Sequence, residues 1–434
     1  MSAAAAGSAL PRPAPWTLGV RALALAVAGL LMLVAGLRAP LFTVLQAGQV
    51  KAIAALNAWM YYNVAFLSAN FLDAGFVRRG LGGTIAALLS RDPDTGAFLF
   101  HLLSAGLLIA ALLVLGWRLF RAASWPAAAF MLLFCVVSPQ LFLGWGNDIA
   151  RTDMAVIGCI AFAAIALDAG RPAMAAALLV FGFMVHETAI IFGLPLLFAV
   201  AVMRQGDGLR GARPLLPHAL GLVAVIVGLV LVQGLVTPET DVFVRSMVDH
   251  TPAPESAWYR DLRDCAIYMM VTGLRGLKTA MCYNVYYDAY GFMVVFSVLV
   301  TLANGLALGL ERRWGVFAVA ILAPVLFMDL VANDIGRWVK FACASSWILS
   351  ALLQERGVVR IGGMRLALGV LLLGGLLFMG SSRVHTVNRM SEALALRLGY
   401  PVAPEVGDWM THCDPDWRSV VGMAPDAMAP AVPR

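Results

Sequence analysis

The chain has 434 residues, of which 61% are hydrophobic and only 13% are charged. Soluble domains carry about 45–50% apolar and about 25% charged residues, so this composition excludes a water-soluble fold and indicates a protein that lies in lipid. The formal net charge of +6 does not indicate nucleic-acid binding, because most Lys and Arg residues lie at the ends of apolar runs, where membrane topology requires them.

The apolar runs indicate helices rather than strands. Runs of about 17–25 residues match the length that a helix needs to cross the hydrocarbon core. Lipid admits only helices and closed barrels, and the strands of a barrel would alternate polar and apolar residues, which these runs do not. The sequence therefore predicts an all-α fold, a polytopic transmembrane helical bundle of about eleven spans with external loops that form a site.

The charges between the runs order the spans. Residues 1–15 are expected to form a disordered cytoplasmic tail, and the run at 16–37 is the first span because it is too long for a signal peptide. The bundle then covers 16–380, with external loops at 39–94 and 237–290 and an external tail of short helices at 381–434. The other expected spans are 97–119, 126–145, 154–167, 218–236, 291–310, 314–331, 338–353 and 366–380.

One apolar stretch, 172–203, is too long for a single upright span. A helix of that length would extend about 48 Å, well beyond a hydrocarbon core of about 30 Å. It could be one tilted helix with His186 and Glu187 buried near its middle, or two short helices that turn at this pair. The basic loop that follows favours two helices, because an even number of crossings returns it to the cytoplasm.

The six cysteines show no metal-binding spacing. Cys265 and Cys282 share one external loop and could form a disulfide in an oxidising compartment, although the pairing does not follow from the sequence.

The expected topology places five polar clusters on the external face. The first, 73–83, contains Asp73, Arg78, Arg79 and four glycines. An external arginine pair runs against the usual cytoplasmic bias of basic residues, and guanidinium groups bind phosphate bidentately. The cluster predicts a catalytic carboxylate beside a phosphate clamp; the alternative is an interfacial helix whose arginines contact lipid head groups.

Two further clusters surround expected helix ends. Asn147, Asp148, Arg151 and Asp153 could form either a site or a capped helix start with a local ion pair. His186-Glu187 lacks the second histidine of a zinc-protease motif, so it is either a site pair or a pair that fixes a turn.

The last two clusters lie later in the chain. Asp329, Asn333 and Arg337 would share one face of a continuous helix, and Asp334 with Arg337 could form a local bridge. The loop at 237–290 is rich in Asp, Arg and Tyr, which suits a sugar-binding surface and an interfacial aromatic belt equally.

The many spans, the acid in the first external loop, the charged later loops and the short broken helices together resemble the GT-C class of integral-membrane glycosyltransferases. The resemblance implies an inverting transfer of sugar from a polyprenyl-phosphate donor to an envelope glycan or lipid acceptor, outside a bacterial inner membrane. It implies Asp73 as catalytic base. Ala74 follows where a common form of the pattern has a second acid, so a divalent cation remains an open question.

The chemistry assigns roles to the clusters. Such a transfer needs a base for the acceptor hydroxyl and cations that hold the leaving phosphate. The candidate bases are Asp73 and then Asp148, and the candidate phosphate ligands are Arg78, Arg79 and Arg337. The candidate substrate-binding residues are Asn147, Arg151, Asp153, His186, Glu187, Asn333 and Asp334.

Two alternatives stay open. One is an envelope polysaccharide polymerase or ligase, and the other is a transporter or flippase of lipid-linked glycans. A transporter places its ionisable residues near the membrane midplane. One external pocket that holds Asp73 and Arg337 would favour an enzyme, whereas a central cavity that reaches both faces would favour transport.

Overall fold

The structure is a computed structural model, and it describes residues 15–47, 58–74, 76–77, 79–122, 125–137, 149–204, 212–235, 244, 247–248, 257–272, 274–332, 334–359, 386–401 and 404–421. Within these ranges the regular elements are helices and no strand occurs, which confirms an all-α fold. The expected N-terminal tail at 1–15, apart from Pro15, and the expected last span at 366–380 lie outside the described residues.

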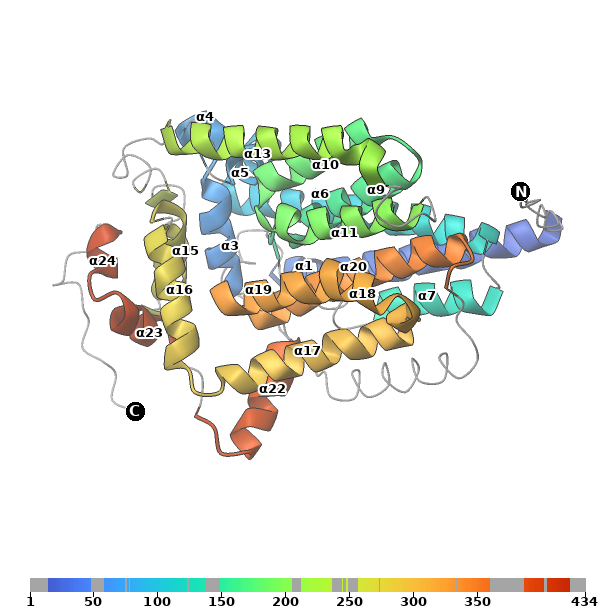
Figure 1. Ribbon diagram of the computed structural model, residues 1–434. Coiled ribbons are helices and arrows are strands. Elements are labelled where there is room, and N and C mark those ends of the chain that lie inside the picture. Colours follow the sequence, from blue (N-terminus) through green and yellow to red (C-terminus); the bar gives the residue numbers. More distant parts are fainter. Residues whose placement is uncertain are drawn as a thin grey trace.

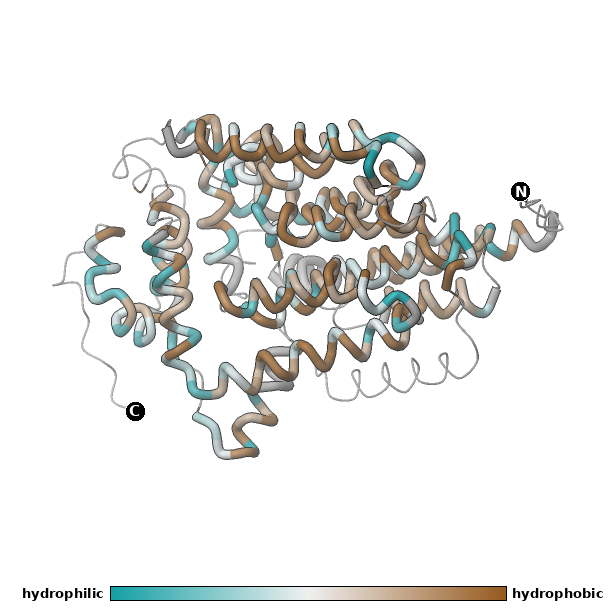
Figure 2. The backbone as a smooth tube through the Cα atoms, viewed as in Figure 1, coloured by the Kyte–Doolittle hydropathy of each residue, from teal (hydrophilic) through white to brown (hydrophobic). Residues whose placement is uncertain are grey.

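Long apolar helices lie side by side and form the body of the molecule (Figure 1). In the described part of the chain, four are long and apolar enough to cross a membrane: Pro93–Ala122, Arg213–Val232, Tyr290–Ala307 and Trp314–Val331. Most of their residues are hydrophobic (Figure 2). In α13 (Leu216–Leu235), for example, Leu220 and Leu231 are more than half exposed, which suits contact with lipid.

The body also contains α1 (Pro15–Ala47), whose apolar part is Leu18–Val34, α7 (Trp125–Val137), α9 (Asp153–Asp168), α10 (Pro172–Val185), α11 (Thr188–Arg204) and α20 (Ile335–Glu355). Of the four helices that could cross a membrane, Pro93–Ala122 is α6 and Tyr290–Ala307 is α17. The helix at Trp314–Val331 consists of α18 (Trp314–Phe317), which continues through a π-helical turn at Ala318–Leu322 into α19 (Ala323–Val331).

Side-chain contacts define two ends of this body. Asp153 at the start of α9 pairs with Arg337 near the start of α20, and Asp168 at the end of α9 pairs with Arg356 just after α20. The two helices therefore run parallel. We call the end where α9 and α20 begin the cavity end, and the opposite end the far end.

The stretch at 172–203 forms two helices that turn at His186-Glu187, as predicted. Gly182 of α10 lies against Ala189 of α11, and Gly193 lies against Leu179, so the helices pack antiparallel as a hairpin. The His186-Glu187 pair therefore lies at the tip of a hairpin and not at the middle of a long helix.

A second layer of helices crosses the cavity end. In Figure 1, α3 (Ala58–Ser68), α15 (Ala257–Val271) and α16 (Leu274–Tyr286) run roughly perpendicular to the long helices. α15 packs on α3 through a separate apolar core that contains Ala65 and Tyr268. The expected external loops thus contain helices. Two short C-terminal helices, α23 (Val406–Cys413) and α24 (Trp417–Val420), join this crossing layer, whereas α22 (Thr386–Arg397) contacts α17 and α20.

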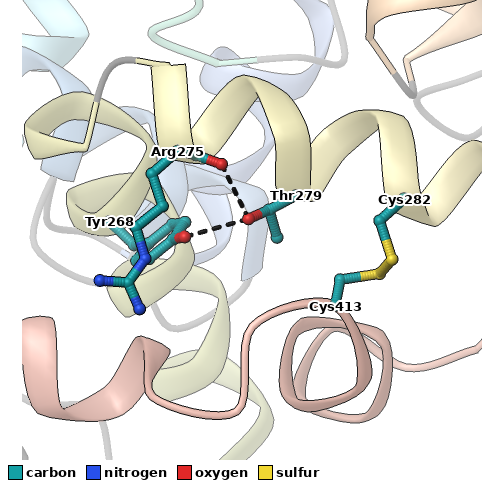
Figure 3. Close-up of a disulfide and its surroundings, with 5 residues drawn as sticks. All are labelled: Tyr268, Arg275, Thr279, Cys282 and Cys413. Carbon is teal, nitrogen blue, oxygen red and sulfur yellow. Dashed lines mark hydrogen bonds between the residues drawn. A yellow bond between two sulfur atoms is a disulfide. The ribbon is translucent and has the colours of Figure 1, made fainter.

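A disulfide ties the C-terminal segment to the crossing layer. Cys282 of α16 is bonded to Cys413 at the end of α23 (Figure 3). The alternative pairing of Cys265 with Cys282 is wrong, because Cys265 is buried in the core between α15 and α23, where its thiol contacts Met410 Sδ at 3.9 Å. Asp414 reinforces the tie, since its carboxylate accepts hydrogen bonds of 2.5 and 2.6 Å from Arg275.

Candidate functional site

A small cavity at the cavity end is lined by basic and polar side chains. Its volume is about 20 Å³, which is room for about one water molecule. Three of the side chains that line it are arginines, and they come from separate elements. The lining residues are Tyr62, Asn63, Phe66, Leu67, Arg79, Ala150, Arg151, Thr152, Val185, His186 and Arg337.

Each of the three guanidinium groups pairs with a carboxylate from another element. Arg79 donates two hydrogen bonds to Glu187, with Nε 2.6 Å from Oε2. Arg151 Nη2 lies 2.5 Å from Asp334 Oδ2. Arg337 Nε lies 2.7 and 2.9 Å from the two carboxylate oxygens of Asp153.

These partners differ from the local ones that sequence spacing suggests. Arg151 could pair with Asp153, and Asp334 with Arg337, but the structure exchanges the partners between α9 and α20. Asp329, Asn333 and Arg337 do not share one continuous helix, because α19 ends at Val331 and α20 begins at Ile335. Asp329 is consequently buried elsewhere, with Ser297 Oγ 2.6 Å from its carboxylate.

In the described part of the chain, four helices begin at this cavity. α5 (Gly80–Leu89) follows Arg79, α9 follows Thr152, α11 follows Glu187 and α20 follows Asp334. The residues that precede α5, α9 and α20, which are Arg79, Thr152 and Asp334, do not cap these helices with their own side chains. Because the start of a helix carries about half a positive charge and free N–H groups, the cavity suits an anion.

The backbone around the cavity adopts two costly conformations. Arg79 and Ala150 have φ angles of 59° and 66°, in the left-handed region that costs side-chain-bearing residues about 1–3 kcal/mol. Asn63 Nδ2 donates to Ile149 O at 2.7 Å, and Ala150 N donates to His101 Nδ1 at 3.2 Å. Neither Asn63 nor His101 stands out in the sequence, because each is a single polar residue with no partner nearby in the chain.

His186 has a defined orientation. Its Nδ1 accepts a hydrogen bond from the backbone N–H of Thr188 at 3.2 Å and lies 3.6 Å from Glu187 Oε2. In the neutral ring the proton therefore sits on Nε2. Burial raises the pKa of the Tyr62 hydroxyl, which therefore stays protonated and is able to donate a hydrogen bond.

Asp73 lines a second cavity, of about 550 Å³, together with Asn70, Ser90 and Arg91. It is exposed in the short helix α4 (Phe71–Ala74), and Asn70 Nδ2 donates to its carboxylate at 2.7 Å. The single pocket expected for Asp73 and Arg337 is thus divided into two cavities, which share Leu67 as a lining residue.

The remaining predicted residues, Arg78, Asn147, Asp148 and Asn333, lie outside the described residues. Among the side chains that are described, no group of three or more His, Cys, Asp and Glu residues could hold a metal ion. Comparison of the chain with protein-family models, with curated proteins and with solved structures gives no match in any of the three.

Proposed function

We propose that the protein is a membrane glycosyltransferase that moves a sugar from a lipid-phosphate donor to an envelope glycan or lipid acceptor. The observation that carries the proposal is the meeting of three guanidinium groups and four helix starts at one cavity in the described part of the chain. This is an anion site, and the donor's phosphate binds there.

Asp73 is the general base. It lies outside the arginine cavity, is exposed and lines the larger of the two cavities. The acceptor occupies the larger cavity, and donor and acceptor meet at the wall that contains Leu67. Asp73 takes the proton of the acceptor hydroxyl, the hydroxyl oxygen attacks the anomeric carbon, and the phosphate leaves with the bonding electrons toward Arg79, Arg151 and Arg337.

The cavity end faces the extracytoplasmic side of a bacterial inner membrane, with about eleven spans and a cytoplasmic N-terminus. The disulfide between Cys282 and Cys413 supports this orientation, since disulfides persist in oxidising compartments and the bond lies in the layer across the cavity end. A membrane-impermeant maleimide applied to intact cells should label Val285→Cys, because Val285 is an exposed residue of α16. It should not label Arg313→Cys, which lies at the far end.

The transport alternative expects ionisable residues near the membrane midplane, and His186 and Glu187 are the pair that lies in the middle of a long apolar stretch of the sequence. Their position at the tip of the hairpin, beside the arginine cavity, supports the enzyme. A polysaccharide polymerase or ligase would use the same phosphate chemistry with a longer glycan.

Two substitutions test the proposal. In membranes supplied with a labelled polyprenyl-phosphate sugar, Asp73→Asn and Arg79→Ala should each lower transfer at least roughly 100-fold, while protein level and insertion stay normal. Arg121→Ala, which changes an exposed arginine at the end of α6, is the control and should retain activity. Full activity in both site variants would overturn the proposal.

A further inference from the structure

We infer that Glu187 occupies the place on Arg79 that a ligand's phosphate takes, and that phosphate displaces it on binding. The inference deepens the proposed function and depends on it for the identity of the ligand. The paired arginine and glutamate would then be a resting state, in which the protein's own carboxylate satisfies the guanidinium group until a phosphate arrives.

The size of the cavity favours such a displacement. About 20 Å³ holds one water molecule, and a phosphate group with four oxygens needs several times that space. The guanidinium edge of Arg79 is also fully used, because its Nε and Nη2 both donate to Glu187. A phosphate can form the same bidentate contact only where the glutamate carboxylate now lies.

Charge balance points the same way. In the described structure the three arginines of the cavity are matched by Glu187, Asp334 and Asp153. A phosphate added to this balanced set would leave excess negative charge in a largely buried site, which is costly. An exchange of one carboxylate for one phosphate charge keeps the balance.

Glu187 is the carboxylate best placed to leave. Its side chain is 28% exposed, whereas that of Asp334 is 20% exposed and that of Asp153 only 2%. It also lies in the two-residue turn between α10 and α11, whereas Asp153 is fixed in the first turn of α9.

Arg79 has contacts that would hold it in place after the exchange. Its guanidinium carbon lies 5.2 Å from the centre of the Phe66 ring, and Nη1 lies 3.8 Å from Met270 Sδ. The released Glu187 remains at the start of α11, where the helix dipole stabilises a negative charge. The exchange therefore needs movement of one side chain and no rearrangement of Arg79.

Binding to the purified full-length protein tests this inference without any transfer reaction. We would titrate detergent-solubilised protein with farnesyl phosphate and, separately, with inorganic phosphate, and compare Glu187→Gln with the unchanged protein. Removal of the competing carboxylate should tighten farnesyl phosphate binding roughly tenfold. The reason is that phosphate no longer has to break the charge-assisted contact between Glu187 and Arg79. Tenfold tightening for inorganic phosphate as well would identify free phosphate as a sufficient ligand.

Two further variants make the result specific. Asp261→Asn is the matched control. Like Glu187, Asp261 pairs with an arginine, which is Arg418 at 3.3 Å, but it does not line the cavity. The affinity of the Asp261→Asn variant for phosphate should equal that of the unchanged protein. In an Arg79→Gln background, Glu187→Gln should give no gain, because the site for which glutamate and phosphate compete is gone.

The outcomes separate the two proposals. If folded Glu187→Gln binds farnesyl phosphate as the unchanged protein does, or more weakly, the displacement is overturned. The proposed function still stands in that case if Arg79→Gln weakens phosphate binding. If Arg79→Gln has no effect either, the phosphate site itself is wrong. If neither Glu187→Gln nor Glu187→Ala folds, the ion pair is structural, and this too overturns the inference.

Discussion

The two ends of the helical body use the same residue types in opposite settings. At the far end Asp168 is paired with Arg118 and Arg356, and Arg118 also contacts Glu355 at 2.6 Å. At the cavity end Asp153, Asp334 and Glu187 are paired with Arg337, Arg151 and Arg79. Both ends tie α9 to α20 through ion pairs.

The ends differ in their relation to the helix dipoles. At the far end Arg118 lies near the end of α6 and Arg356 follows α20, where a positive charge is favourable by about 0.3–1 kcal/mol. At the cavity end the arginines lie at helix starts, where the same charge is unfavourable. The far-end arginines are therefore favourably placed for the dipoles of α6 and α20, whereas the cavity-end arginines depend on the carboxylates of Glu187, Asp334 and Asp153 to balance them.

The largest expected effect compares one aspartate at each end. Asp153→Ala should destabilise the protein by about 3–5 kcal/mol, because it leaves the buried guanidinium group of Arg337 without its partner. Asp168→Ala should cost only about 1 kcal/mol, since Arg118 and Arg356 are 22% and 28% exposed and can be hydrated. Thermal unfolding in detergent measures both; equal losses would contradict the distinction between the ends.

The crossing layer should depend on its disulfide. Cys282→Ser should destabilise the docking of the C-terminal segment by about 2–4 kcal/mol, because the bond closes a loop across 131 positions. Limited proteolysis should then cut within the segment that contains α23 and α24. The control is Cys265→Ser, which leaves the disulfide intact and should not expose the segment; rapid cleavage of both variants would show that burial of Cys265 matters more.

The sequence predicted the helical class and several positions in the fold for clear physical reasons. The turn at His186-Glu187 followed from the excess length of the apolar stretch and the basic loop after it. Seven of the predicted site residues converge at one end of the body, in agreement with the expected topology: Arg79, Arg151, Asp153, His186, Glu187, Asp334 and Arg337. What these residues do stays a prediction.

Pairing partners could not be predicted in the same way. Spacing favours neighbours such as Asp334 with Arg337, but partners are chosen by packing, and α9 lies beside α20 only in the folded chain. The same limit applies to Cys413, whose bond to Cys282 depends on the docking of a distant segment. His101 supports Ala150 from another helix, so no local pattern marks it.

A glycine substitution tests how closely the cavity end is packed. A Cβ atom on Gly83 would lie 2.1 Å from Ala69 O and 2.3 Å from Leu67 O, both backbone atoms that cannot move aside cheaply. Gly83→Ala should therefore destabilise the protein by about 1–3 kcal/mol, as overpacking does. Gly82→Ala, in the same turn of α5, meets its nearest neighbour at 3.4 Å and should be neutral in the same melting experiment.

The smallest expected effect concerns acid. Hydrogen bonds from Arg275 lower the pKa of Asp414 below its ordinary value, with a further bond from Tyr268 acting in the same direction. A carboxyl whose pKa is lowered by folding contributes stability above its unfolded pKa, about 3.9, and this stability is lost as the pH falls through the folded pKa. The contribution should be below about 1 kcal/mol, because Arg275 is 47% exposed.

Proteolysis of the C-terminal segment from pH 6 to about pH 3 should therefore rise less steeply in Asp414→Asn than in the unchanged protein. Identical acid profiles would mean that the disulfide alone holds the segment, and the crossing layer would then lack the charge-based support that both ends of the helical body have.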